Sequence, residues 1–518
     1  MRPPNILWYC TDQQRFDTIH ALGNSHIRTP NLDRLVERGV AFERAYTQSP
    51  ICTPSRASFL TGRYPAAHHV HRNGNDAFPA GESLVTRLLA DAGYDCGLAG
   101  KLHLSRAKGR IENRPDDGYR VFHWSHHPKP DWPEGHAYAR WLEEEKGIDP
   151  AALWAEYADR PYGVPADLHQ TTWCTEMALR FVDEQRQGPW LMCLNPFDPH
   201  PPFDAPKEYL DRYDPISLPW PLFRPEDVER QRSFAAIDQQ TRVAVDPHAM
   251  SGSGGIGPGG RAGAIREMPA VGGDRPGMAD GQVGVEIERD SASQPPDAYD
   301  ARLVKASYYA MIELIDNELG RLLDSLDKRG ELDNTIIIFM SDHGELLGDH
   351  GLLYKGCRFF ESLVHVPVIV SWPARIASGL RSRALVELVD IAPTLLDLAG
   401  LPIPSQMHGR SLMPVLLGEA DPDFHKSHVV CEYWDAVEIP SGPTEHTHAT
   451  MRFDGRHKSV VYHGHDIGEI YDLDADPGEF TNLWDRPDSR ELKEELLMKH
   501  IDAFAATGGA GPERSAAY

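Results

Sequence analysis

The chain has few cysteines and no pattern among them. Seven occur in 518 residues, an odd number, and none are spaced as Cys-x-x-Cys. Scattered thiols of this kind argue against a disulfide framework and predict reduced cysteines in a cytoplasmic protein. The apolar run that begins at Asn5 also leaves no room for the apolar core and cleavage site of a signal peptide.

Long hydrophobic runs are absent as well. No apolar stretch approaches the roughly 20 residues that a helix needs to cross a bilayer. We therefore expect a soluble protein with no membrane partner. The sequence leaves open its assembly into a homo-oligomer.

Positive charge is scarce. Lys and Arg total 52 against 77 Asp and Glu, so the formal net charge is -25. This balance argues against a nucleic-acid-binding surface and makes long-range attraction of anions unfavourable. An anionic substrate would therefore need a locally basic pocket.

Strand-like and helix-like segments alternate through most of the chain. Short β-branched apolar runs are typical of buried strands, and apolar residues at spacings of three and four are typical of covering helices. The alternation predicts an α/β fold with a large central mixed, mostly parallel sheet flanked by helices. Strands are expected at 6–10, 95–99, 190–195, 335–340 and 364–371, and helices at 31–38, 83–92 and 301–326.

Two regions depart from this alternation. Residues at about 248–298 are rich in glycine and proline without a sustained period, which predicts an irregular insertion, either a plain surface loop or a substrate lid. Near the C-terminus, strand-like pieces at 428–433, 458–462 and 469–473 precede a helical 489–504. We therefore expect a catalytic domain at 1–420 and a smaller C-terminal antiparallel α/β subdomain at 421–518.

The most informative motif is Cys-Thr-Pro-Ser-Arg at residues 52–56. Pro54 and Ser55 suit the first turn of a helix, whose unpaired N–H groups and positive dipole end face the preceding residues. Cys52 would have a lowered pKa in that position, and an anion would bind beside it. Arg56 adds a guanidinium, the side chain best matched to a tetrahedral oxyanion.

This motif, with Thr-Gly-Arg at 61–63, resembles the signature of the sulfatase family. The resemblance implies that a formylglycine-generating enzyme oxidises Cys52 to formylglycine, and that Arg56 holds the hydroxyls of its hydrated form. A geminal diol can attack sulfur with one oxygen and use the other to expel sulfate as the aldehyde re-forms. Residues 470–483 resemble the C-terminal region of the same family.

A metal site is expected where two strands end. Asp12 follows the first strand, and Asp342 and His343 follow the strand at 335–340, at positions where open α/β sheets bind ligands. With Cys52, these residues would offer a divalent cation carboxylate oxygens, one imidazole nitrogen and the oxygen of the modified residue. Such a cation would lower the pKa of a coordinated hydroxyl and withdraw charge from the transferring group.

Two positions depart from the commonest sulfatase pattern, which has Asp-Asp at the first site and Asp-Asn at the last, usually with calcium. Here Gln13 follows Asp12, and His343 follows Asp342. Similar departures occur in the relatives that hydrolyse phosphonate monoesters and phosphodiesters, and in choline-sulfatase-like enzymes. The imidazole makes Mn²⁺ an alternative to Ca²⁺, and Gln13 is expected to contact substrate.

Further matches to the family complete a basic pocket. Lys101 and His103 stand in an element that resembles Gly-Lys-x-His-Leu, which implies that Lys101 bridges substrate and nucleophile oxygens and that His103 helps the hemiacetal to collapse. His200 and Lys355 also match family positions, and either could protonate the departing alkoxide. Asn73 matches an asparagine of the phosphonate hydrolase relatives and is expected to bind substrate.

These features predict an arylsulfatase-like hydrolase that cleaves small anionic sulfate monoesters. Phosphonate monoesters or phosphodiesters are the alternative substrates, indicated by Gln13, Asn73 and His343. Both classes carry one negative charge around a tetrahedral centre, so one pocket could accept both. A third hypothesis is a catalytically silent binding protein that keeps the fold without maturation of Cys52.

Overall fold

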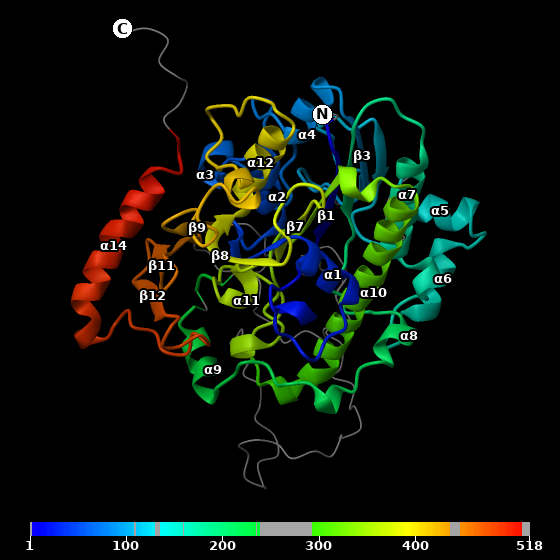
Figure 1. The fold of residues 1–518 in the computed structure, drawn as a ribbon. Coiled ribbons are helices and arrows are strands. Elements are labelled where there is room, and N and C mark those ends of the chain that lie inside the picture. Colours follow the sequence, from blue (N-terminus) through cyan, green and yellow to red (C-terminus); the bar gives the residue numbers. More distant parts are fainter. Residues whose placement is uncertain are drawn as a thin grey trace, which may run out of the picture.

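The computed structural model describes residues 3–107, 110–129, 135–158, 160–234, 236–238, 293–435 and 446–509. The chain forms a large sheet and, nearer its C-terminus, a small one (Figure 1). Most of the irregular insertion predicted at 248–298 lies outside the described residues.

The large sheet has the strand order β4-β3-β5-β1-β6-β7-β2-β8. Its strands pair in parallel except around β7, which is antiparallel to both of its neighbours, β6 and β2. The sheet is therefore mixed and mostly parallel, as predicted. The strands are β1 (Asn5–Thr11), β2 (Val40–Tyr46), β3 (Asp95–Gly100), β4 (Val121–Trp124), β5 (Trp190–Asn195), β6 (Thr335–Ser341), β7 (Val368–Ser371) and β8 (Leu380–Glu387).

Helices cover both faces of this sheet. Because successive strand residues point to opposite sides, each strand contributes to two cores. From β1, Ile6 and Trp8 join the core beneath α2, α4 and α12, whereas Leu7 and Tyr9 join the core beneath α1, α7 and α10. These covering helices are α1 (Pro30–Arg38), α2 (Cys52–Thr61), α4 (Val85–Asp91), α7 (Gln170–Asp183), α10 (Ala301–Lys328) and α12 (Ile391–Leu398). Shorter helices are α3 (Pro65–His68), α5 (Ala137–Glu144), α6 (Pro150–Tyr157), α8 (Lys207–Leu210), α9 (Pro225–Arg232), α11 (Glu361–Val364) and α13 (Met413–Leu416).

One predicted strand is shorter than expected. The sequence predicts a strand at 364–371, but Val364 ends the one-turn helix α11 and β7 begins only at Val368. Pro367 explains the difference, because proline has no N–H to donate to a neighbouring strand. The other predicted helices and strands agree with the structure to within about two residues at each end.

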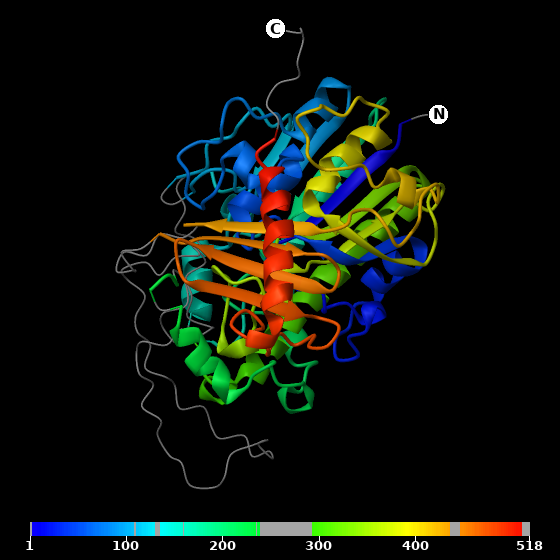
Figure 2. The same ribbon diagram turned by 90° about the vertical axis from the view of Figure 1, so that its left-hand side faces the viewer.

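The small sheet is antiparallel, in the order β12-β11-β10-β9. Its strands are β9 (Val429–Trp434), β10 (His448–Phe453), β11 (His457–His463) and β12 (Ile467–Asp472). Helix α14 (Arg490–Ala505) lies across its outer face (Figure 2). Met451 and Tyr462 on the opposite face pack with Tyr46 of the large sheet. The predicted C-terminal antiparallel α/β unit is therefore confirmed.

Two buried lysines form ion pairs between the small sheet and the rest of the protein. Each lysine ammonium lies between two carboxylates, so its charge is balanced inside the protein. The pairs and their N–O distances are Lys458–Glu361 2.6 Å, Lys458–Glu479 2.8 Å, Lys426–Glu387 2.5 Å and Lys426–Asp390 2.7 Å.

Two expectations drawn from absences can be compared with the structure. Among the helices of the described residues, none is both long and apolar enough to span a bilayer. The seven cysteines are buried and form no disulfide.

Candidate active site

The predicted site residues gather at one edge of the large sheet. Strands β3, β5, β1 and β6 are parallel neighbours, so their carboxyl ends lie side by side. Lys101 directly follows β3, Asp12 follows β1 and Asp342 follows β6. Topology therefore brings together groups that are up to 330 positions apart in the sequence.

Cys52 lies at the centre of this group. It is the first residue of α2 and is only 1% exposed. Its Sγ lies 3.1 Å from Nε2 of His343, 3.7 Å from Oδ1 of Asp12 and 2.8 Å from Nζ of Lys355. Lys101 Nζ is 3.7 Å from the same sulfur. A thiol in this position contacts both the carboxylate side and the cationic side of the cluster.

The four predicted metal ligands form one compact, buried set. One ligand atom from each of Asp12, Cys52, Asp342 and His343 lies within 4.8 Å of the others. His343 Nδ1 lies 2.9 Å from the carbonyl oxygen of Gly344, which can only accept a hydrogen bond. The proton is therefore on Nδ1, and Nε2 is left as a ligand atom that faces Cys52. This donor set fits a divalent cation.

Arg56 orients the acidic side of the cluster. Its Nε donates to Oδ2 of Asp342 at 2.9 Å, and its Nη1 donates to the carbonyl oxygen of Lys101 at 3.0 Å. Its Nη2 lies 3.7 Å from Oδ2 of Asp12 and has no hydrogen-bond partner among the described residues. This buried N–H group is therefore the part of the guanidinium that remains for an oxyanion.

Lys355 and His200 form the opposite, basic side. Lys355 Nζ lies 3.0 Å from Nε2 of His200 and 2.9 Å from Oε1 of Gln13. His200 Nδ1 lies 2.7 Å from the carbonyl oxygen of Pro201, so the His200 proton is on Nδ1 and Nε2 accepts from Lys355. Sequence analysis placed both residues in the pocket, but their direct contact could not be predicted from it.

The charges around Cys52 change its acidity. Burial, with a smaller contribution from the charge of Asp117, raises the pKa of Cys193 to about 12. Burial and Asp12 also raise the pKa of Cys52, but the cations Lys101 and Lys355 oppose them and lower it to about 7. The locally basic surroundings that an acidic protein would need for an anion are therefore present around this thiol.

The structure places two further predicted residues at the margin of the cluster. Asn73 Oδ1 accepts from the backbone N–H of Thr53, so its amide nitrogen is the group left for a substrate. The ring of His103 packs edge-on against His126 at 4.4 Å, and burial, with the charge of Lys101, holds the pKa of His103 well below its usual value. No hydrogen bond joins His103 to Cys52 among the described residues.

Sequence reasoning missed several buried polar groups near the cluster. Glu345 receives hydrogen bonds from Gln13 and from the backbone N–H of Leu347. Glu112 accepts from the backbone N–H of His103. The signal for Glu345 was a second carboxylate shortly after Asp342, but proximity in sequence gave no indication of what its side chain would contact.

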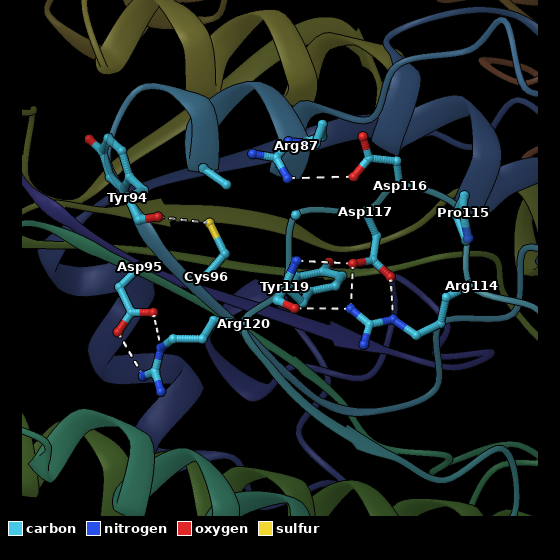
Figure 3. Close-up of a pocket in the computed structure, with 12 residues that line it drawn as sticks. Arg87, Tyr94, Asp95, Cys96, Arg114, Pro115, Asp116, Asp117, Tyr119 and Arg120 are labelled. Atoms are coloured by element: carbon cyan, nitrogen blue, oxygen red, sulfur yellow. Dashed lines mark hydrogen bonds and ion pairs between the residues drawn. The ribbon is translucent and has the colours of Figure 1, made fainter.

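A surface cavity of about 450 Å³ lies at the other end of β3 (Figure 3). Its lining carries both signs of charge, and its three described arginines pair with carboxylates that also line it. These pairs are Arg87–Asp116, Arg114–Asp117 and Arg120–Asp95. The cavity therefore differs from the predicted basic pocket, whose cations gather around a nucleophile at the opposite edge of the sheet.

Comparisons with known proteins identify the family of the chain. A family model described as Sulfatase matches residues 4–401, and a model described as N-sulphoglucosamine sulphohydrolase, C-terminal, matches residues 348–505. The chain is 28% identical to an arylsulfatase of Clostridium perfringens, over 96% of this chain and 94% of that protein. It is also 28% identical to an N-acetylglucosamine-6-O-sulfatase of Bacteroides thetaiotaomicron, over 96% of this chain and 85% of that protein.

Solved structures include a close match in fold. The phosphonate monoester hydrolase of Agrobacterium radiobacter superposes with a TM-score of 0.74 at 26% identity, over 97% of this chain and 96% of that one. The shared fold is of the alkaline-phosphatase-like type. Since the Sulfatase model alone covers more than half of the chain, the protein belongs to the sulfatase family and is a sulfuric ester hydrolase.

Proposed function

We propose that this hydrolase cleaves sulfate monoesters with Cys52, converted to formylglycine, as its nucleophile. The observation that carries the proposal is the position of Cys52 Sγ. It lies 3.1 Å from Nε2 of His343 and 2.8 Å from Nζ of Lys355, at the first residue of α2. In the mature enzyme an oxygen would stand where this sulfur lies. Conversion by a formylglycine-generating enzyme and a cytoplasmic location belong to the same proposal.

Asp12, Asp342 and His343 would hold a divalent cation together with the oxygen of residue 52. The cation would supply Lewis acidity to the nucleophile and to the ester oxygens. Ca²⁺ suits the carboxylate oxygens, and the imidazole nitrogen favours Mn²⁺. Arg56 supports this arrangement because it fixes Asp342 through the 2.9 Å hydrogen bond from Nε.

The cationic side chains would bind the ester and supply a proton. Lys101 and Nη2 of Arg56, which has no hydrogen-bond partner among the described residues, would offer charge and N–H groups to the ester beside the nucleophile. Between the two predicted general acids, the hydrogen-bond geometry favours Lys355. His200 uses its proton on Pro201 and accepts from Lys355, so it positions the ammonium, which donates to the departing oxygen.

Phosphonate monoesters or phosphodiesters are a second candidate substrate class. Gln13 and His343 stand where the commonest sulfatase pattern has Asp and Asn, and the phosphonate monoester hydrolase of Agrobacterium radiobacter shares the fold at 26% identity. The arylsulfatase and N-acetylglucosamine-6-O-sulfatase relatives support the first class.

Two measurements test the proposal. Mass spectrometry of the Cys52 peptide should find the aldehyde, and a peptide that carries only the thiol in active enzyme would refute the nucleophile. A matched panel of aryl sulfates and aryl phosphonate monoesters with the same leaving groups should give a higher kcat/KM for the sulfates. The reverse ranking would establish the second class instead.

A further inference from the structure

Gln13 bridges a buried carboxylate and the proposed proton donor. Its Nε2 donates to Oε2 of Glu345, and its Oε1 accepts from Nζ of Lys355 at 2.9 Å. Gln13, Glu345 and Lys355 are all nearly or fully buried. A single side-chain amide therefore connects Glu345, which does not reach Cys52, to an ammonium that does.

The backbone of Gln13 is held as firmly as its side chain. Its φ is 71°, in the left-handed region that non-glycine residues seldom adopt. Its N–H donates to Oδ1 of Asp342 at 3.0 Å, and its carbonyl oxygen accepts from the hydroxyl of Tyr308 at 2.6 Å. These contacts fix where the side chain starts, so the remaining freedom is which way round the amide lies.

Glu345 decides that orientation. Its Oε1 accepts from the backbone N–H groups of Leu347 at 2.9 Å and Tyr354 at 2.5 Å, and its Oε2 faces the amide of Gln13. An ionised carboxylate only accepts hydrogen bonds, so the NH₂ group of Gln13 must point toward it. The reversed amide would set oxygen against carboxylate and NH₂ against ammonium, and both contacts would be repulsive.

We propose that Glu345 is a positioning residue of this enzyme, which acts by locking the Gln13 amide so that its oxygen holds Lys355 beside the nucleophile. The inference rests on the role proposed for Lys355. Lys355 Nζ also faces Cys52, His200 and His343, at 2.8, 3.0 and 3.4 Å. The amide oxygen of Gln13 is a further acceptor that holds the ammonium in this position.

A reciprocal exchange of the acid and the amide tests the lock. In Glu345→Gln, one oxygen must serve Leu347 and Tyr354, so the introduced NH₂ faces Gln13 and turns its amide. The NH₂ of Gln13 then opposes Lys355, and we expect kcat/KM on alkyl sulfates to fall about 10- to 100-fold. In Gln13→Glu, two carboxylates face each other, and a similar loss is expected.

The double variant Gln13→Glu/Glu345→Gln should recover most of this loss. The introduced carboxylate can accept from the introduced amide and from Lys355, and the net charge is unchanged. Asp349→Asn is the matched control, because Asp349 follows β6 as Glu345 does but pairs with Arg15 and is not part of the bridge. It should lower the melting temperature while the dependence of rate on leaving-group pKa stays as in the wild type.

The proposal would be supported if the double variant recovers kcat/KM and if the rate of Glu345→Gln depends more steeply on leaving-group pKa than that of the wild type. Additive losses in the double variant, or an unchanged kcat/KM in Glu345→Gln, would overturn it. If Glu345→Gln does not fold, the double variant should still exceed Gln13→Glu in activity, and failure to do so also counts against the lock. Full activity of Lys355→Ala would instead refute the proposed role of Lys355, a separate result.

Discussion

Two buried lysines of this protein have opposite surroundings. Lys458, between the two sheets, lies 2.6 Å from Glu361 and 2.8 Å from Glu479, and its Nζ also donates to a backbone carbonyl. Lys355, in the candidate active site, faces an amide oxygen, a thiol and two imidazoles, and among the described residues no carboxylate pairs with it.

The difference indicates that the charge of Lys458 stabilises the fold, whereas the charge of Lys355 serves to bind or protonate a ligand. A buried ion pair that is complete in itself holds two surfaces together, and removal of one partner is costly. A buried cation without a carboxylate partner has its charge balanced only when an anion binds. Its desolvation costs folding free energy, and a bound anionic ligand offsets that cost. By this reasoning, substitutions in the first cluster should change stability, and substitutions in the second should change activity.

The nucleophile gives the largest expected effect. Cys52→Ala removes the side chain that we propose is converted to formylglycine, so turnover should be lost while the melting temperature stays near that of the wild type. Steady-state kinetics and thermal unfolding measure the two quantities. Residual activity above about a hundredth of the wild-type rate would contradict the proposed chemistry. Such activity corresponds to a loss of less than roughly 3 kcal/mol in transition-state stabilisation.

Lys355→Ala should lose about 10²–10⁴-fold in rate on alkyl sulfates, whose alkoxide leaving groups need a proton. The loss should be much smaller on nitrophenyl sulfate, because nitrophenolate leaves with little help. A series of phenyl sulfates of increasing leaving-group pKa measures the effect, with His200→Ala alongside. Equal losses across the series would mean that Lys355 only binds the anion.

Lys458→Met is the structural counterpart. It leaves Glu361 and Glu479 without their cation, so we expect the free energy of unfolding to fall by about 3–5 kcal/mol. Urea unfolding measures this loss. Activity per folded molecule should stay unchanged, and a selective loss of kcat in a stable variant would break the distinction between the two lysines.

Asp342→Asn and His343→Ala should reduce metal affinity about 10- to 100-fold, because each removes or weakens one donor of the cluster. Metal content after dialysis, measured by plasma mass spectrometry, tests this independently of rate. Wild-type metal content in both variants would place the cation elsewhere.

The smallest effect concerns acid sensitivity at the interface between the sheets. Burial raises the pKa of Asp390, but Lys426 overcomes it and lowers that pKa to about 2. The unfolded value is about 3.9, so roughly 2–3 kcal/mol of stability is present above about pH 4 and is lost as the pH falls toward 2. The stability gap between the wild type and Lys426→Met should narrow from pH 6 to pH 3. A constant gap would mean that Asp390 does not titrate in this way.

Much of the fold could be predicted because its signals are local. The runs that became β1, β5 and β6 are apolar over their whole length, and α10 shows a sustained helical period. Strands such as β8, with arginines in its first half, and β10 were not predicted. β8 pairs with β2, which lies far away in sequence, whereas β10 pairs with its neighbours along the chain, β9 and β11.

The candidate site divides in the same way. Asp12 and Asp342 could be located because strand ends meet at one edge of a parallel sheet, and Cys52 because of its motif. Contacts such as Gln13 with Lys355, which are 342 positions apart, depend on a left-handed backbone and on side-chain direction. Neither can be derived from residue type, so the role of Glu345 emerged only from the structure.

The burial of Cys52 has a consequence for the timing of synthesis. The residues that cover its sulfur include His343, 291 positions later in the chain. At about 5–20 residues per second, roughly 15–60 s pass between the synthesis of the thiol and the arrival of that cover. If Cys52 is converted as proposed, the modifying enzyme would have this interval in which to reach an uncovered side chain, whereas the finished fold leaves it 1% exposed. The rate of translation and the rate of the proposed maturation would then be in competition.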